Sequence, residues 1–158
     1  MGTYSKSLAA IGGFVAGSPD VINFIKHVGR SMIFSASLPP SLVASVSTAL
    51  DIIEEQPQLR DQLWRNTHKM LNGYRTLGFD TGESQTPIIP IIIRDSLKVY
   101  KMCRRLFDHG VFVNPVVSPA VPPGRELLRT SFMATHTEEQ LDKVLDAFEK
   151  VGKEVGVI

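Results

Sequence analysis

A lysine surrounded by hydroxyl side chains stands near the start of this 158-residue sequence. The chain reads Gly-Thr-Tyr-Ser-Lys-Ser from residue 2, so Thr3 and Ser5 lie close to Lys6. Hydroxyl groups and exposed backbone N–H groups hold phosphate oxygens, and a lysine supplies positive charge or a nucleophilic amine. The paired glycines Gly12 and Gly13 follow, and they suit a backbone that turns sharply or approaches another group closely. The pattern is typical of an anion site, and an ordinary surface turn is the alternative.

Two other positions have side chains that could bind a ligand. Ser35 and Ser37 flank Ala36 in a short segment that ends in two prolines, and either serine could instead cap a following helix. Arg129 lies in an apolar run of strand character. A guanidinium group matches a carboxylate bidentately, which would fix a carboxylate substrate in one orientation. An ordinary surface ion pair is the alternative for this arginine.

Composition excludes several classes of function. Lys plus Arg number 17 and Asp plus Glu number 16, a net charge of +1, so the chain lacks the basic footprint of a nucleic-acid or anionic-membrane binder. No apolar run approaches the length of a bilayer span. The single cysteine, Cys103, excludes a disulfide framework and suits a reducing intracellular compartment. The histidines have no metal-ligand spacing, so we expect no metal site.

Apolar periodicity and punctuation by glycine and proline predict the elements that must hold these residues. Ser18 as N-cap with Pro19 in the first turn begins one helix, and Thr137 with Gln140 forms a capping box that begins the last one. Pro90 within an isoleucine-rich run indicates an edge strand or a bulge. The predicted helices lie at 19–28, 41–55, 57–77, 95–109 and from 137 onward, and the predicted strands at 87–93, 111–113 and 127–133.

The two halves of the sequence differ in character. Residues 3–17 read as a hairpin-like segment, and residues 30–40 read as a linker between helices. Beyond residue 80 the order is strand–helix–strand–strand–helix, which is an α+β unit. Trp64 and Tyr74 are expected to be core and packing residues. The sequence therefore predicts a boundary near residue 80.

Three motifs in order resemble one enzyme family. Thr-Tyr-Ser-Lys-Ser-Leu-Ala with Ile-Gly-Gly-Phe, the block Arg30–Pro40 and the block Leu128–Thr137 resemble the α-oxoamine synthases. These are pyridoxal 5′-phosphate enzymes with the type I aminotransferase fold. Within the family, the stretch Gly110–Pro123 is most similar to bacterial serine palmitoyltransferases. The resemblance extends over essentially the whole chain.

The resemblance implies a role for each candidate residue. Lys6 would form the covalent link to the pyridoxal 5′-phosphate aldehyde and act as base at the substrate Cα. Thr3 and Ser5 would bind the cofactor phosphate. Ser35 and the backbone N–H of Ala36 would reach the phosphate from a partner subunit, so the active site would be shared across a homodimer. Arg129 would bind the α-carboxylate of the amino-acid substrate.

The family resemblance also implies an activity. We expect a cytoplasmic acyltransferase that condenses an amino acid, with serine favoured, with an acyl-CoA and releases CoA and CO₂, a step of sphingolipid biosynthesis. One alternative is a paralogue that uses glycine or alanine, such as 2-amino-3-ketobutyrate CoA ligase or 8-amino-7-oxononanoate synthase. Another is a noncatalytic small-domain fragment that serves dimer contact or folding.

The resemblance assigns the chain to one part of a larger α/β fold. Residues 1–80 would be the C-terminal end of the large cofactor-binding domain, and residues 81–158 the small C-terminal α+β domain. In the family the aspartate that pairs with the cofactor ring nitrogen lies in the large domain, before the lysine. We therefore expect the chain to be a C-terminal portion that is poorly active alone, because the cofactor needs that charge partner.

Overall fold

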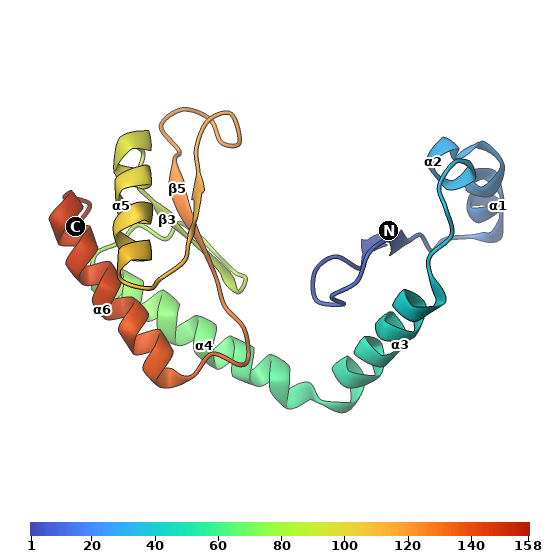
Figure 1. Ribbon diagram of the computed structural model, residues 1–158, viewed down its shortest axis with the longest axis horizontal. Coiled ribbons are helices and arrows are strands. Elements are labelled where there is room, and N and C mark those ends of the chain that lie inside the picture. The colour runs from blue at the N-terminus through green and yellow to red at the C-terminus, as the bar shows by residue number, and fades with distance from the viewer. The chain divides into compact units, whose positions relative to one another are not determined.

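The chain forms two compact units in a computed structural model that describes all 158 residues (Figure 1). The first unit is Met1–Pro57 and the second is Gln58–Ile158. The resemblance also predicts a boundary near residue 80, between a large and a small domain, and this boundary remains a prediction. The first unit holds β1 (Gly2–Thr3), β2 (Gly13–Phe14), α1 (Pro19–Val28), α2 (Arg30–Ile33) and α3 (Pro40–Glu55). The remaining elements are α4 (Pro57–Thr76), β3 (Ile88–Ile92), α5 (Ser96–Asp108), β4 (Asn114–Val116), β5 (Leu127–Ser131) and α6 (Glu138–Val155).

The first unit begins with a short antiparallel hairpin of β1 and β2. Gly2 pairs with Phe14 and Thr3 pairs with Gly13. A Cβ on Gly13 would lie 2.6 Å from the Gly2 carbonyl oxygen, a distance that real Cβ atoms do not show. Gly12 has a φ of +104°, a conformation that side-chain-bearing residues rarely adopt. The predicted need for paired glycines at a sharp turn and a close approach is confirmed.

The helices of the first unit begin and end close to the predicted positions, with two differences. α1 begins at Pro19, as predicted, but the Ser18 side chain makes no capping hydrogen bond. The segment 30–40, expected as a linker, contains the four-residue helix α2. The carbonyl of Gly29 accepts the N–H groups of Met32 and Ile33, which begins this new turn directly after α1 ends.

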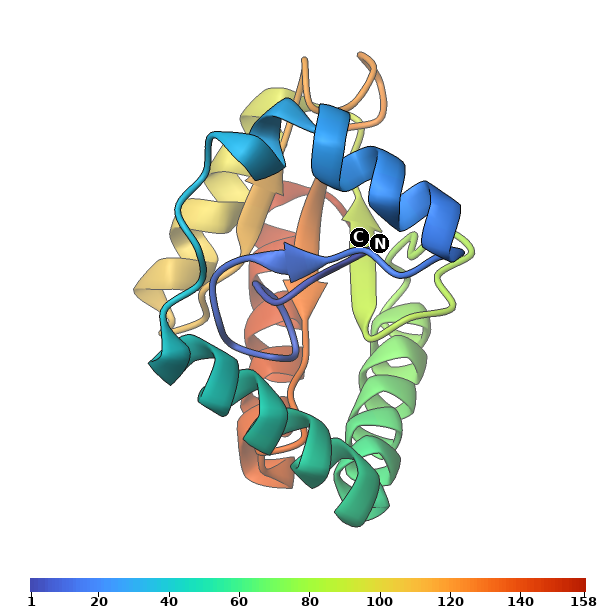
Figure 2. The same cartoon turned by 90° about the vertical axis from the view of Figure 1, so that its right-hand side faces the viewer.

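The first unit has almost no buried core. Ala10 and Val46 are its two buried apolar residues. Figure 2 shows the hairpin and the helices α1, α2 and α3 of this unit, coloured from dark blue to teal. Its large apolar side chains are more than one third exposed at many positions, among them Ile11, Phe14, Phe24, Met32, Phe34, Val43 and Leu50.

The second unit is built on a three-stranded antiparallel sheet in the order β3-β5-β4. Pro90 lies in β3, which is an edge strand, so the edge prediction is confirmed. An edge strand tolerates proline, because the missing N–H is not needed to pair with a second neighbouring strand. The predicted strand at 111–113 is wrong. The Val111 N–H bonds to the Leu106 carbonyl at the end of α5, and strand pairing begins only at Asn114.

Helices pack on one face of this sheet. The residues that alternate toward that face, such as Ile89, Ile91 and Leu128, are fully buried. Figure 1 shows α5 and α6 beside β3 and β5, with α4 in the same unit. Tyr74 belongs to this core, as predicted, whereas Trp64 is 41% exposed and stacks on His68. The core comprises Met70, Tyr74, Phe79, Ile89, Ile91, Val99, Met102, Leu106, Val113, Leu128, Leu141, Ala147, Phe148, Val151 and Val155.

Capping fixes the ends of the helices that cover the sheet. The Asp95 carboxylate accepts the N–H groups of Leu97 and Lys98 at the start of α5. Thr137 and Gln140 form both hydrogen bonds of the predicted capping box at the start of α6. These caps set where the connecting loops leave the helices. None of the helices has the length and apolar character needed to cross a bilayer.

Candidate functional site

Lys6 lies in a tight turn within the β1–β2 hairpin. Its backbone carbonyl accepts the Ala9 N–H at 2.9 Å, and the Tyr4 carbonyl accepts the Ala10 N–H at the same distance. The Tyr4 N–H bonds to the Gly12 carbonyl, which closes the loop. The Lys6 side chain is exposed and makes no ion pair. A fixed backbone therefore presents a free primary amine.

Two hydroxyl groups lie together on the same hairpin. The Thr3 hydroxyl is 3.1 Å from the Ser5 hydroxyl and accepts the Ser5 N–H at 3.2 Å. The Thr3 hydroxyl also lies 3.3 Å from the Gly12 carbonyl. Hydroxyl protons rotate, so both groups can turn to donate to an anion. The donor set, two hydroxyls and a lysine next in the sequence, suits the oxygens of a phosphate monoester.

A hollow of about 610 Å³ adjoins Thr3 within the first unit. Its walls are mostly apolar, and Lys26 on α1 is its charged member. The Tyr4 and Phe14 rings stack at 5.8 Å between centroids on the same hairpin. The hydroxyl cluster thus sits at the border of an apolar surface, where a ligand with a flat organic part and an anionic end could lie.

Ser35 and Ala36 lie in the exposed segment between α2 and α3. Neither Ser35 nor Ser37 caps α3. The N-cap residue of α3 is Pro39, and no side chain forms a capping hydrogen bond there. The capping alternative is therefore wrong. The segment makes no hydrogen bond to Thr3, Ser5 or Lys6. Its predicted role in reaching a cofactor from a partner subunit stays a prediction.

Arg129 is placed by the sheet of the second unit. It lies on the central strand β5, opposite Pro90 of β3 and Asn114 of β4, on the face that the helices leave open. Its neighbours Leu128 and Thr130 are buried on the other face. The Arg129 side chain is exposed and makes no ion pair within the chain, so the ordinary surface ion pair is not formed. A rigid strand thus presents a free guanidinium group.

Arg129 also lines a hollow of about 490 Å³ in the second unit, which we call the second-unit hollow. Sequence reasoning missed this feature because its walls come from distant segments. It is lined by Tyr74, the segment 109–114, the segment 129–132, His136, Gln140, Leu141, Lys143 and Val144.

Asn66 on α4 fixes the turn that follows the Arg129 strand. Its side-chain N–H groups donate to the carbonyls of Met133 at 2.9 Å and His136 at 3.1 Å, and its Oδ1 accepts from Gln62 at 2.8 Å. The side chain is buried and fully used. The helical spacing of α4 gave a weak sign of this role, since the asparagine stands one turn before Met70 on the buried face. The partners, about 70 residues away, could not be read from the sequence.

Comparison with known proteins identifies the family. A family model described as aminotransferase class I and II matches residues 1–148. A serine palmitoyltransferase of Bacteriovorax stolpii is 48% identical over 153 residues, which are 97% of this chain and 36% of that protein. An 8-amino-7-oxononanoate synthase of Thermoanaerobacter pseudethanolicus is 43% identical over 158 residues, which are 100% of this chain and 40% of that protein.

A solved structure gives the same result at the level of the fold. It is a serine palmitoyltransferase with a pyridoxal phosphate internal aldimine, and it superposes with a TM-score of 0.93 at 36% identity. The match covers 99% of this chain and 40% of that one. The chain therefore spans about two fifths of the length of its relatives. As the three motifs predicted, the chain belongs to the aminotransferase class I and II family and has part of the type I aminotransferase fold.

Proposed function

We propose that this chain supplies the cofactor lysine and the carboxylate-binding arginine of a pyridoxal phosphate-dependent acyltransferase. The enzyme would condense an amino acid, serine in the first place, with an acyl-CoA and release CoA and CO₂. With serine and a long-chain acyl-CoA the product is a 3-keto sphingoid base, a sphingolipid precursor. The likeness to serine palmitoyltransferases and 8-amino-7-oxononanoate synthases supports this class of reaction.

The observation that carries the proposal is the hairpin turn that contains Lys6 and the hydrogen-bonded hydroxyls of Thr3 and Ser5. The two hydroxyls, 3.1 Å apart, fit the phosphate end of the cofactor, and the exposed Lys6 amine fits its aldehyde end. When bound, the cofactor supplies an electron-accepting ring that stabilises negative charge at the substrate Cα. We assign Thr3 and Ser5 to phosphate binding and Lys6 to covalent attachment.

The chain's own residues do the remaining work. An uncharged Lys6 amine accepts and returns a proton at the substrate Cα, which is general acid–base catalysis. Arg129 binds the substrate α-carboxylate through two parallel N–H donors. Because β5 is the central strand and Thr130 is anchored to the Ile89 carbonyl at 2.8 Å, the arginine backbone is fixed before substrate arrives.

Three further assignments belong to this proposal. We place Ser35 and Ala36 at the cofactor phosphate of a partner subunit, which requires a homodimer with a shared active site. We propose a cytoplasmic location, which suits the free thiol of Cys103. We also propose that residues 1–80 are the end of a large cofactor-binding domain and residues 81–158 a small domain.

A chimeric enzyme tests the proposal. In the Bacteriovorax stolpii serine palmitoyltransferase, this chain replaces the 36% of the protein that it matches. We expect CoA release with serine and palmitoyl-CoA, and a drop of at least about 100-fold in Lys6→Ala, because proton transfer is lost. Lys150→Ala, an exposed lysine of α6 outside both hollows, is the matched control and should keep full activity.

The same chimera separates the alternatives. Preference for alanine or glycine over serine would replace the serine assignment with that of a paralogue. A folded chimera with no CoA release from any of the three amino acids would refute the catalytic proposal. For Arg129→Ala we expect a serine KM raised roughly 10- to 100-fold with a smaller change in kcat, because a hydrogen-bonded charge pair is lost. An unchanged KM would remove Arg129 from carboxylate binding.

A further inference from the structure

The turn that follows the Arg129 strand is held from α4 by one buried side chain. Asn66 is 3% exposed, and its amide donates to the carbonyl oxygens of Met133 and His136 at 2.9 Å and 3.1 Å. Both acceptors belong to the segment between β5 and α6. Because a carbonyl oxygen can only accept, the Asn66 amide nitrogen must face the turn and its oxygen must face away. The partners of this amide therefore fix its orientation.

Gln62 completes the orientation of the amide. Its Nε2 donates to the Asn66 Oδ1 at 2.8 Å, from one turn earlier on α4. Both the nitrogen and the oxygen of the Asn66 amide thus have partners. A satisfied buried amide specifies one arrangement of its surroundings, because any other arrangement would leave a buried polar group without a hydrogen bond. Asn66 therefore sets where the turn lies.

The same turn positions the His136 ring. The His136 Nδ1 accepts the Met133 N–H at 3.3 Å, and the Met133 carbonyl accepts the His136 N–H at the same distance. The ring packs edge-on against Phe132, with 6.4 Å between the ring centroids. An Nδ1 that accepts carries no proton, so in this arrangement the ring proton is on Nε2. Asn66 thus reaches the His136 ring through the backbone of the turn.

The groups placed by the turn lie beside Arg129. Phe132 and His136 line the second-unit hollow together with Arg129. β5 ends at Ser131, so sheet pairing does not place the segment from Met133 to His136. A shift of this turn would move the wall of the hollow and leave the arginine backbone where the sheet holds it. The space available to a ligand at the guanidinium group therefore depends on the turn.

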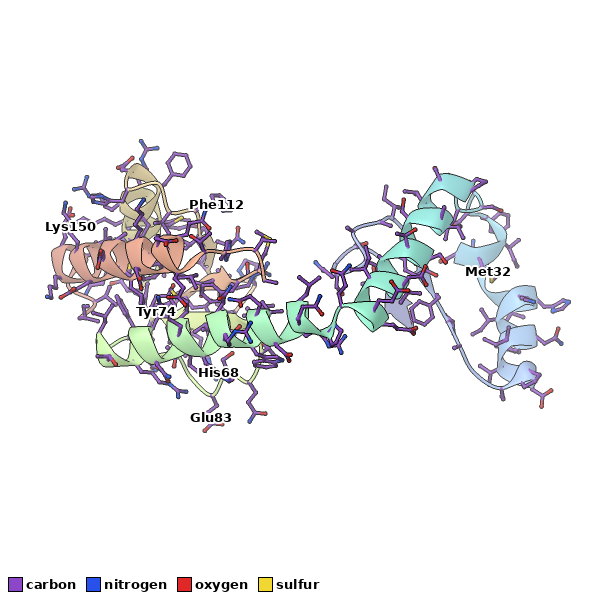
Figure 3. All side chains as sticks on the ribbon, turned by 90° about the horizontal axis from the view of Figure 1, so that it is seen from below. Met32, His68, Tyr74, Glu83, Phe112 and Lys150 are labelled. Carbon is purple, nitrogen blue, oxygen red and sulfur yellow. The ribbon has the colours of Figure 1, made fainter.

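α4 contacts the Arg129 strand at a second point. Tyr74 lies further along the same face of α4 and is fully buried, and Thr130 is the hydrogen-bonding neighbour of its hydroxyl. Figure 3 shows Tyr74 between α4 and α6. Tyr74 thus supports the strand itself, whereas Asn66 supports the segment after the strand. Loss of the Asn66 amide should release the turn while the strand stays in place.

We propose that Asn66 is a positioning residue for amino-acid binding at Arg129. It acts through the turn from Met133 to His136, which holds Phe132 and His136 as the wall that confines a small amino acid beside the guanidinium group. The inference rests on the proposed function, because that function assigns the substrate carboxylate to Arg129.

Kinetics of the chimeric enzyme test the inference. In Asn66→Ala we expect a serine KM about tenfold higher, with kcat and the palmitoyl-CoA KM changed less than about twofold, because amino-acid binding is weakened equally in the ground state and the transition state. Thr67→Val is the matched control. Thr67 is also buried on α4, but its hydroxyl bonds to the Leu63 carbonyl within the helix, so the serine KM should not change. An unchanged serine KM in folded Asn66→Ala would overturn the inference.

A second variant keeps the inference testable where Asn66→Ala does not fold. Gln62→Glu keeps the size of a partly exposed side chain, so we expect the fold to hold. A carboxylate at this position cannot donate to the Asn66 Oδ1 and attracts the amide nitrogen away from the turn. The serine KM should therefore rise a few-fold. An unchanged serine KM in Gln62→Glu would show that the orientation of the amide has no effect on amino-acid binding and would contradict the inference.

Nuclear magnetic resonance of the 158-residue chain tests the positioning without enzyme activity. At about pH 9 an ordinary histidine ring is uncharged, and its nitrogen chemical shifts report which nitrogen carries the proton. We expect His136 to show the Nε2–H form in the unaltered chain and a mixture of both forms in Asn66→Ala.

The two measurements separate this inference from the proposed function. The same His136 spectrum in both proteins would show that Asn66 does not hold the turn, which would refute the inference and leave the acyltransferase proposal standing. A folded chimera without CoA release would refute the acyltransferase proposal and, with it, the role of Asn66 in amino-acid binding, whatever the His136 spectrum shows.

Discussion

The two units of the chain support their candidate residues in opposite ways. In the first, the Lys6 turn is held by backbone hydrogen bonds and by glycines that allow a close approach, over a unit with two buried apolar residues. In the second, Arg129 lies on the central strand of a sheet that covers a continuous core. The amine and the guanidinium group to which we assign roles in the proposed function thus rest on supports of different stability.

The difference between the two units follows from what stabilises each of them. A hairpin of two residue pairs gains little from burial, so its conformation depends on local geometry. A sheet under three helices gains from every buried side chain. Contacts made outside the chain are expected to matter for the first unit and much less for the second. The following predictions test that contrast, from the largest expected effect to the smallest.

Removal of a buried aromatic ring should show the largest difference in stability between the two units. Phe148 is fully buried, and its ring lies 4.8 Å from that of Tyr74 and 5.7 Å from that of Phe79 between centroids. Phe148→Ala should lower the free energy of unfolding by about 3–5 kcal/mol, because transfer and cavity costs add. Phe24→Ala, at a ring 67% exposed in the first unit, should change it by less than about 0.5 kcal/mol. Urea unfolding followed by circular dichroism measures both, and similar losses would break the contrast.

The hairpin should fail locally when a single methyl group is added. In Gly13→Ala the new Cβ meets the Gly2 carbonyl oxygen at 2.6 Å, which should cost about 1–3 kcal/mol of local stability. Amide hydrogen exchange should speed up at Tyr4, whose N–H bonds to Gly12, and stay unchanged at Leu128 in the second unit. Gly17→Ala, where a Cβ has ordinary contacts, is the control. Unchanged exchange at Tyr4 would show that the hairpin does not need this close approach.

The N-cap residues of α6 and α1 give a matched pair. Thr137→Ala removes the side-chain oxygen that accepts the Gln140 N–H, and it should cost about 1 kcal/mol of unfolding free energy. Ser18→Ala removes no capping bond and should cost less than about 0.5 kcal/mol. Denaturant midpoints compare the two. A larger loss in Ser18→Ala would mean that its hydroxyl caps α1 in solution.

Acid should affect the second unit through Asp80, with a small effect. The Gly82 N–H and the Arg94 guanidinium lower the pKa of Asp80 below its ordinary value. A carboxylate whose folded-state pKa is lowered adds stability above its unfolded-state pKa, and that stability is lost as the pH falls through the folded-state value. Asp80→Asn should therefore make the loss of stability between about pH 5 and pH 2 shallower.

Urea midpoints across that range measure the acid effect. Because the Asp80 side chain is 42% exposed, solvent screens its charge and the change should be slight. Arg94→Met should give part of the same change, because the Gly82 N–H remains. A steeper acid dependence in Asp80→Asn would contradict the assigned sign.

Local chemistry made many elements predictable from the sequence. Pro19, the Thr137 capping box and Pro90 each act within a few residues of their position, so the starts of α1 and α6 and the edge strand β3 could be read directly. The strand expected at 111–113 failed because Val111 is tied to the end of α5, which competes with sheet pairing for the same short segment. The prediction that Trp64 is a core residue was also wrong. An aromatic residue on a helix is equally compatible with a core and with stacking on a neighbouring ring at the surface.

The features of the candidate site also divide into those set by neighbours in the chain and those set by tertiary packing. The neighbours of Lys6 are its neighbours in the chain, so the sequence by itself determined the hydroxyl cluster, the paired glycines and the family. Only the tertiary structure decided that Tyr74 is buried beside Thr130 and that Asn66 holds the turn after Arg129. Hydrogen-bond partners about 70 residues apart leave no periodic trace in a sequence, because packing, and not spacing, brings them together.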